Sequence, residues 1–153
     1  MQRTELLDLF ERVLLTRGPD EVRTALMNLD TGPGSDLDSL TIIANAGIHE
    51  IPKAFLRGEV YEASRGDWDA STEEALIGEL ITILSRLANK LRSQQWQRVY
   101  LIPTGHPILS IQIKAMVFRL LRLNTIDLYY KAGKYFEVDL DQRGIALKAG
   151  SRG

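Results

Sequence analysis

The sequence predicts an α/β fold in which a mostly parallel β-sheet is flanked by helices. Three short segments, at 40–45, 99–102 and 126–130, are apolar and rich in β-branched or aromatic residues, as buried strands are. The amphipathic segment 108–123 joins the second of these strands to the third, which makes a βαβ unit with a right-handed crossover. Such a unit is the core of a Rossmann-like sheet.

Composition restricts the class of protein. The chain has 153 residues, of which 44% are hydrophobic, so it is long enough for one ordinary globular domain. We divide it into an N-terminal helical segment, 1–30, and a Rossmann-like domain, 36–148. There is no cysteine, which excludes disulfides, thiolate metal sites and cysteine nucleophiles and fits a reducing compartment.

Charge and hydropathy exclude two kinds of partner. No apolar stretch approaches the roughly 20 residues needed to span a bilayer, and residues 1–5 lack the basic region of a signal peptide. We therefore expect a soluble cytoplasmic protein without a membrane partner. With 19 Lys+Arg against 20 Asp+Glu, the chain has no overall field that would concentrate long nucleic acid. Any phosphate ligand should be small and bound locally.

Two helices are predicted before the sheet. Residues 4–16 place five apolar side chains on one stripe, and Thr4 is a candidate N-cap. Gly18 ends this helix, and Pro19 opens a shorter one that continues to residue 29. The segment 30–35 has no periodic apolar content and is predicted to be a linker.

A short helix and a strand are predicted after the first apolar segment, 40–45. Residues 48–57 are expected to form the helix, which Gly58 stops, and 59–62 form the strand. Ser71 and Glu74 make a capping box for a long amphipathic helix over 72–93.

The carboxyl end of the chain is predicted to form a hairpin. The turn 131–134 joins the strand at 126–130 to a second one at 135–138, which would be an antiparallel edge strand. Residues 149–153 are expected to be frayed.

The only two histidines each follow a turn at the end of a predicted strand. In one parallel sheet both turns would lie along the carboxyl edge, where open α/β sheets bind ligands. The second turn also opens a helix, whose first amides would face a bound anion. A phosphate fits that chemistry, although small polar residues are also common in turns that bind nothing. The candidate ligand-binding residues of the two turns are Asn45, Ala46, Gly47, His49, Thr104, Gly105 and His106.

Two cations could reach a phosphate at this edge. Lys53 and Arg57 are four residues apart and would share one face of the predicted 48–57 helix. Tyr129, Tyr130 and Tyr135 could stack on a base, but cross-strand packing is the more usual role at a hairpin. No cluster of histidines and carboxylates has metal-ligand spacing, so neither a metal nor another cofactor is expected.

Acid/base catalysis is a second interpretation of the histidines. Imidazole titrates near neutrality, so His49 or His106 could move a proton during cleavage of a ribose phosphodiester. Histidines can equally donate hydrogen bonds without chemistry, and neither a nucleophile nor a paired base is evident. The catalytic residues are therefore left open.

A resemblance to a known family rests on the second turn. Residues 99–107, VYLIPTGHP, are followed by an amphipathic helix and by Asp127-Leu128-Tyr129-Tyr130, and this order resembles the ligand-binding half of CRISPR-associated Rossmann fold (CARF) domains. In that family a Thr/Ser-Gly-rich turn opens a helix and grips a cyclic oligonucleotide second messenger. The related SAVED domains of bacterial anti-phage systems are similar too, including at 131–135. The resemblance covers the layout of residues 38–140, but specific residues only in 99–135.

The resemblance implies a sensor of cyclic oligonucleotides in prokaryotic antiviral defence. Thr104, Gly105 and His106 would be its signal-binding turn, and 45–47 its first-strand turn. His106-Pro107 stand where the family often has a second Gly and a Lys, which leaves ligand identity open. One unit would hold half of a ring, which implies a homodimer. A separate effector protein is also implied, because no nuclease, protease or membrane segment is recognisable.

Two alternatives to the sensor remain. The chain could be a ring nuclease that linearises the messenger, or a protein-interaction module whose turns bind no ligand, because a fold does not establish a function.

Overall fold

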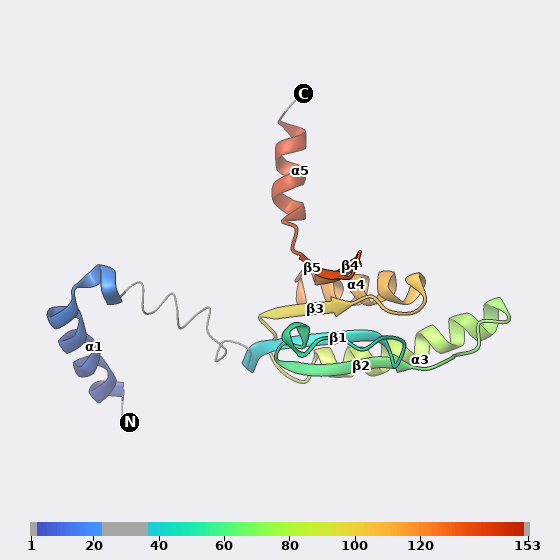
Figure 1. The fold of residues 1–153 in the computed structure, drawn as a ribbon, viewed down its shortest axis with the longest axis horizontal. Coiled ribbons are helices and arrows are strands. Elements are labelled where there is room, and N and C mark those ends of the chain that lie inside the picture. Colours follow the sequence, from blue (N-terminus) through green and yellow to red (C-terminus); the bar gives the residue numbers. More distant parts are fainter. Residues whose placement is uncertain (1–2, 23–36, 152–153) are drawn as a thin grey trace. The chain divides into compact units, whose positions relative to one another are not determined.

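The computed structural model describes residues 3–22 and 37–151, and the chain divides into two compact units, Met1–Leu37 and Asp38–Gly153. The first unit contains helix α1, Arg3–Arg17, and residues 19–22 are helical as well (Figure 1). The prediction of N-terminal helices is confirmed. Thr4 lies inside the first turn of α1, so its prediction as the N-cap was wrong. Residues 23–29 of the second predicted helix and the linker at 30–35 lie outside the described residues.

The second unit is built on a five-stranded sheet with the strand order β2-β1-β3-β4-β5 (Figure 1). The first four strands are parallel, and β5 runs antiparallel to β4 at the edge. The predicted α/β class, with its mostly parallel Rossmann-like sheet and edge hairpin, is confirmed. The strands are β1 Ser39–Ala46, β2 Glu59–Arg65, β3 Arg98–Ile102, β4 Ile126–Lys131 and β5 Lys134–Val138.

Helices α3, Glu73–Leu91, and α4, Pro107–Leu121, pack against each other and against one face of the sheet. Side chains alternate across a strand, so one set from β1 and β3 faces these helices. Trp96 is buried in this core, and Trp68 packs against it. The buried strand and helix residues of this layer include Leu40, Ile42, Ala44, Val99, Leu101, Ile83, Leu87, Leu91, Leu109, Ile113 and Val117.

The start of α3 corrects the predicted capping box. The N-cap is Thr72, whose side chain accepts a hydrogen bond from the backbone N–H of Ala75. Ser71 instead bonds through its hydroxyl and its backbone N–H to the carboxylate of Asp69. These two hydrogen bonds lower the pKa of Asp69 because they stabilise its charged form. The prediction failed because Asp69 competes for Ser71.

The connection from β1 to β2, residues 47–58, crosses the other face of the sheet as a largely extended segment that we call the strap. The predicted helix over 48–57 was wrong, because the strap contains only one short 3₁₀ turn, η2, Lys53–Phe55. Pro52 before it is extended, with φ −58° and ψ 136°. The Thr41 hydroxyl on β1 donates to the carbonyl of Arg57 (2.6 Å) and accepts from its N–H (3.0 Å). The backbone N–H and carbonyl of Arg57 therefore bond to the sheet and not to neighbouring residues of a helix.

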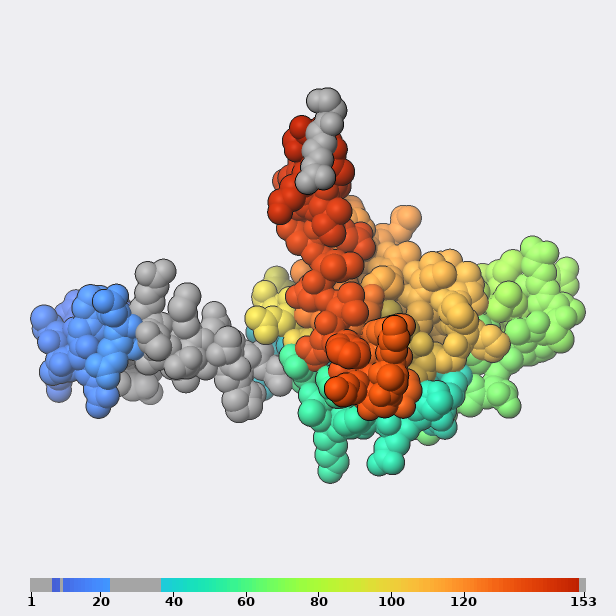
Figure 2. Space-filling model, turned by 45° about the horizontal axis from the view of Figure 1, so that its top comes forward, coloured from blue at the N-terminus to red at the C-terminus, as the bar shows by residue number. Residues whose placement is uncertain are grey.

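Side chains of the strap reach across the sheet to its far edge. The guanidinium of Arg57 pairs with Glu137 on β5 at 2.8 Å and lies 5.2 Å from the centre of the Tyr100 ring. The Phe55 ring lies 5.4 Å from that of Tyr135. The strap and the β4–β5 hairpin therefore border the same sheet face, and Figure 2 shows the orange hairpin against the blue-green strap.

Helix α5, Gln142–Gly150, follows β5. Its N-cap is Asp141, whose carboxylate accepts from the backbone N–H of Gly144 at 3.0 Å. Residues 149 and 150 are helical, so their prediction as frayed was wrong. The signal for this helix in the sequence is its N-cap, Asp141, and not a stripe of apolar residues. None of the described helices has the length and apolar content to cross a bilayer.

The Thr41 anchor gives a stability prediction. Thr41→Val removes the hydroxyl and leaves two backbone groups of Arg57 unpaired, which should lower the free energy of unfolding by about 1 to 3 kcal/mol. Urea unfolding measures this loss. Thr82→Val is the control, because the Thr82 hydroxyl bonds an exposed carbonyl within α3 and its loss should change stability by no more than about 0.5 kcal/mol. Equal losses in the two variants would show that the strap is not anchored by Thr41.

Candidate functional site

The two predicted turns lie at the topological switch point of the sheet. From β1 the chain passes to β2 on one side, and from β3 it passes to β4 on the other. Open α/β sheets bind ligands where neighbouring strands diverge in this way. Residues 45–47 and 103–106 lie at the carboxyl ends of β1 and β3, so the sheet brings the two turns together.

The Thr104 side chain joins the two turns. Its hydroxyl donates to the carbonyl oxygen of Asn45 at 2.5 Å and accepts from the N–H of the same residue at 3.1 Å. The last paired residues of β1 and β3 are Ile43 and Ile102, so this hydroxyl continues the pairing beyond the ladder. The hydroxyl predicted to grip a ligand thus has a structural role.

Gly105 approaches Asn45 too closely for any side chain. Its φ is +85°, and a Cβ built on it would lie 2.7 Å from the Cβ of Asn45. Asn45 is 4% exposed, and its amide donates to the carbonyl of Gly66 at 3.0 Å. Its side-chain oxygen is buried and has no hydrogen-bond partner among residues 3–22 and 37–151. Asn45 therefore packs the turn against the end of β2.

The two histidines have different surroundings. His106 is the N-cap of α4, but its side chain makes no capping hydrogen bond. Its ring meets the ring of Trp68 edge-on, with centroids 4.7 Å apart. His49 instead lines a pocket between the strap and the β4–β5 hairpin. The structure does not bring the two imidazoles into one pocket.

That pocket, of about 830 Å³, lies on the strap side of the sheet at its carboxyl edge. Ile102 and Leu128 contribute apolar surface from β3 and β4, and both belong to a small buried cluster. Residues 103–105 provide the wall nearest α4. Within 37–151, the backbone N–H groups of Gly105 and His106 have no hydrogen-bond acceptor, so the turn offers unpaired donors.

The hairpin adds an aromatic wall. Tyr129, Tyr130 and Tyr135 line the pocket, and the rings of the last two lie 4.9 Å apart, which is the predicted cross-strand packing. Tyr130 is 58% exposed, so part of its ring is accessible to a planar ligand group. Tyr129 precedes it on the same strand, so the Tyr129 side chain points to the opposite face of the sheet.

The site shares some predicted residues and lacks others. Of the candidates, His49, Thr104 and Gly105 line the pocket, whereas residues 45–47 and His106 do not. Glu50 lines it and was not foreseen. Its position directly after His49 was the available signal, but the helix predicted over 48–57 obscured which residues face the sheet.

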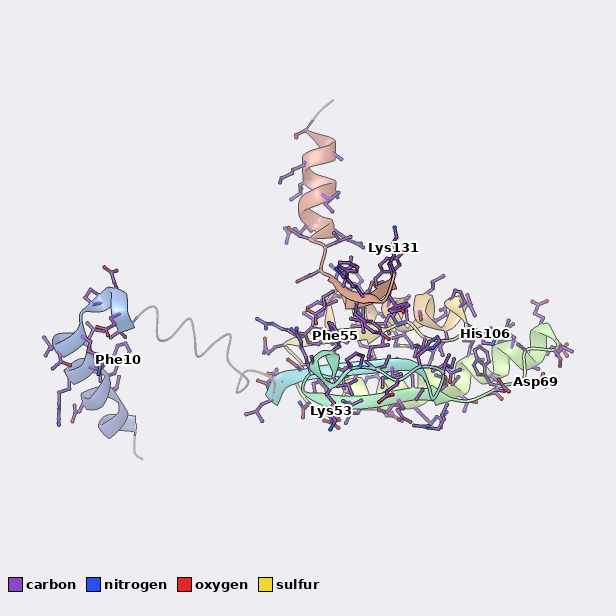
Figure 3. The ribbon with its side chains drawn as sticks, in the orientation of Figure 1. Phe10, Lys53, Phe55, Asp69, His106 and Lys131 are labelled. Carbon is purple, nitrogen blue, oxygen red and sulfur yellow. The ribbon has the colours of Figure 1, made fainter. Side chains whose placement is uncertain are left out.

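The predicted cations lie away from the pocket. Figure 3 shows Lys53 nearer the amino ends of the strands and His106 beyond the carboxyl ends. Arg57 is engaged by Glu137. Arg65, at the end of β2, pairs with Glu62 at 2.5 Å, and this hydrogen-bonded pair lowers the pKa of Glu62. Within 37–151, neither Lys nor Arg lines the pocket, so an anion placed there would meet backbone amides and His49.

Neither a metal cluster nor a known relative identifies the site. Within the described residues, no three histidine, aspartate or glutamate side chains gather as metal ligands would. Comparisons with known protein families, curated proteins and solved structures found no match to this chain. The functional argument therefore rests on the geometry of the pocket.

Two glycines that both have a positive φ angle test how closely Gly105 approaches Asn45 at the switch point. Gly66→Ala adds a methyl group in open space at φ +71°, so it should cost only the left-handed strain of about 1 to 2 kcal/mol. Gly105→Ala adds the same strain and a collision with Asn45, which should cost about 1 to 3 kcal/mol more. Chemical denaturation compares the two variants. Equal losses would mean that Asn45 moves aside without cost.

Proposed function

We propose that this chain is a sensor that binds a cyclic oligonucleotide second messenger in prokaryotic antiviral defence. The observation that carries the proposal is the pocket at the switch point, which combines unpaired turn amides with accessible tyrosine rings. Nucleotide ligands need both kinds of group. The resemblance of residues 99–135 to CARF and SAVED domains supports the same ligand class.

The phosphate part of the ligand fits the turn. Gly105 lines the pocket and its amide lies just before α4, a helix of 15 residues, where the partial positive charge of the helix dipole favours an anion. Thr104 holds this turn against β1. Its contribution to binding is to position the amides, and His49 supplies the nearest imidazole of the pocket lining.

The base part of the ligand fits the hairpin wall. Stacking of a nucleobase on an aromatic side chain is worth about 1 to 3 kcal/mol, and tyrosine keeps its hydroxyl available to water. Tyr130 is braced by Tyr135, which is itself braced by Phe55. The wall is therefore ordered before any ligand binds, which reduces the entropy lost on binding.

Binding is favoured over cleavage. A general acid and a general base must both reach the scissile phosphate, but His106 packs against Trp68 and does not line the pocket. The ring-nuclease alternative would pair His49 with Glu50, whose negative charge repels the phosphate that would be cleaved. We therefore propose a binding role for the pocket.

A homodimer and a separate effector complete the proposal. The pocket of one chain contacts one side of a ring-shaped ligand, so two carboxyl edges would enclose it. The effector would be another protein that responds to the occupied dimer.

The two histidines provide a matched test of the site. We expect a cyclic di-, tri-, tetra- or hexanucleotide to bind saturably in calorimetry, and His49→Ala to weaken binding by about tenfold or more through the loss of a hydrogen bond to a charged group. His106→Ala should leave the affinity unchanged, since that ring packs outside the pocket.

Three results would contradict this proposal. The absence of binding to every ring by a folded protein would favour the interaction module. A loss of binding in His106→Ala alone would move the site to the Trp68 side of the turn. Recovery of a linear product would favour the ring nuclease.

A further inference from the structure

We propose that Glu50 makes the pocket selective for guanine, so that the messenger is a cyclic oligonucleotide that contains guanine. This inference rests on the proposed function and specifies its ligand. It starts from a carboxylate whose position a phosphate site alone does not explain.

Glu50 is the only acidic residue of the pocket lining among the residues that the structure describes, and neither Lys nor Arg lines it. Several other glutamates of the second unit have a cation beside them. Glu62 pairs with Arg65, Glu59 with Lys90 and Glu137 with Arg57. Within 37–151 Glu50 has no such pair. Its charge is left to water or to a ligand.

A carboxylate repels phosphate and only accepts hydrogen bonds. A nucleotide that enters this pocket must therefore present donors to Glu50. Hydrogen bonds to an ionised acceptor are roughly twice as strong as neutral ones, so a ligand with two adjacent donors gains most from this side chain.

Guanine is the base with that arrangement. Its pairing edge carries N1–H and the exocyclic N2–H₂ side by side, and the two carboxylate oxygens can accept one bond from each. Adenine presents a ring nitrogen acceptor beside its N6–H₂ donor, and cytosine likewise presents a ring acceptor beside N4–H₂. Uracil places one N–H between two carbonyl oxygens. These acceptors would face the negative charge of Glu50.

The surrounding residues suit a flat ring with a polar edge. Ile102 and Leu128 supply apolar surface, and Tyr130 and Tyr135 supply aromatic rings. Glu50 follows His49 on the strap, and both line the same pocket as the hairpin tyrosines. A base stacked on Tyr130 would turn its edges toward the residues around that ring, and Glu50 is the acidic residue among those of the described pocket lining.

The test compares cyclic di-guanylate with cyclic di-adenylate by calorimetry on the full chain. The wild-type protein should bind the guanylate about 10- to 100-fold more tightly, the range expected for charged hydrogen bonds. Glu50→Gln should lose most of this preference, because its amide NH₂ opposes one of the two guanine donors. Glu74→Gln is the control, since it removes the same charge from the exposed start of α3.

Each outcome separates this inference from the proposed function. Equal affinities for the two rings, or an undiminished preference in Glu50→Gln, would overturn guanine selection while the sensor function stands. Tight binding of adenine rings alone would do the same. If no cyclic oligonucleotide binds, both proposals fail. A thermal melt of each variant confirms that Glu50→Gln is folded, as expected for an exposed side chain.

Discussion

The Thr104 hydroxyl makes the contact on which the site depends. It bonds to both backbone groups of Asn45, so a side chain of one turn replaces a missing rung between two strands. β1 and β3 are parallel, but the chain leaves them toward opposite sides of the sheet, so without this bond their carboxyl ends would separate. Because they are joined there, Gly105 can lie against Asn45 and α4 can begin at a fixed distance from β1. The position of the unpaired amides follows from this bond.

Most of the fold could be predicted because it is encoded locally. The buried strands are short apolar runs, the helix over 73–91 has a long amphipathic stripe, and the turn at 131–134 marks the hairpin. The strap could not be predicted in this way. Pro52 was a local signal against a helix there, but the path of the strap depends on Thr41, which bonds from the sheet to the backbone of Arg57, 16 residues later. A contact at that separation leaves no periodic signal in the sequence.

The sequence predicted that both turns lie at the carboxyl edge of the sheet, but it did not predict which residues line the pocket there. Strand order puts both turns at one edge, and that much follows from the βαβ pattern. The direction of each side chain depends on neighbours from other elements. Trp68, in the loop after β2, contacts the ring of His106. The hairpin tyrosines line the pocket together with His49. Identical residue types in similar turns therefore came to have different environments, and sequence alone could not distinguish them.

The strap has a consequence for how the pocket can change without loss of the fold. The backbone of Arg57 bonds to Thr41 on the sheet, and the side chains of Phe55 and Arg57 contact the hairpin. The pocket-lining residues of the strap, 49–51, come before Phe55 and Arg57 in the chain. Substitutions at His49 and Glu50 change exposed side chains that the helical core does not use. The chemistry of the pocket wall can thus be altered in this short stretch of chain while the sheet and helices that support it keep their sequence.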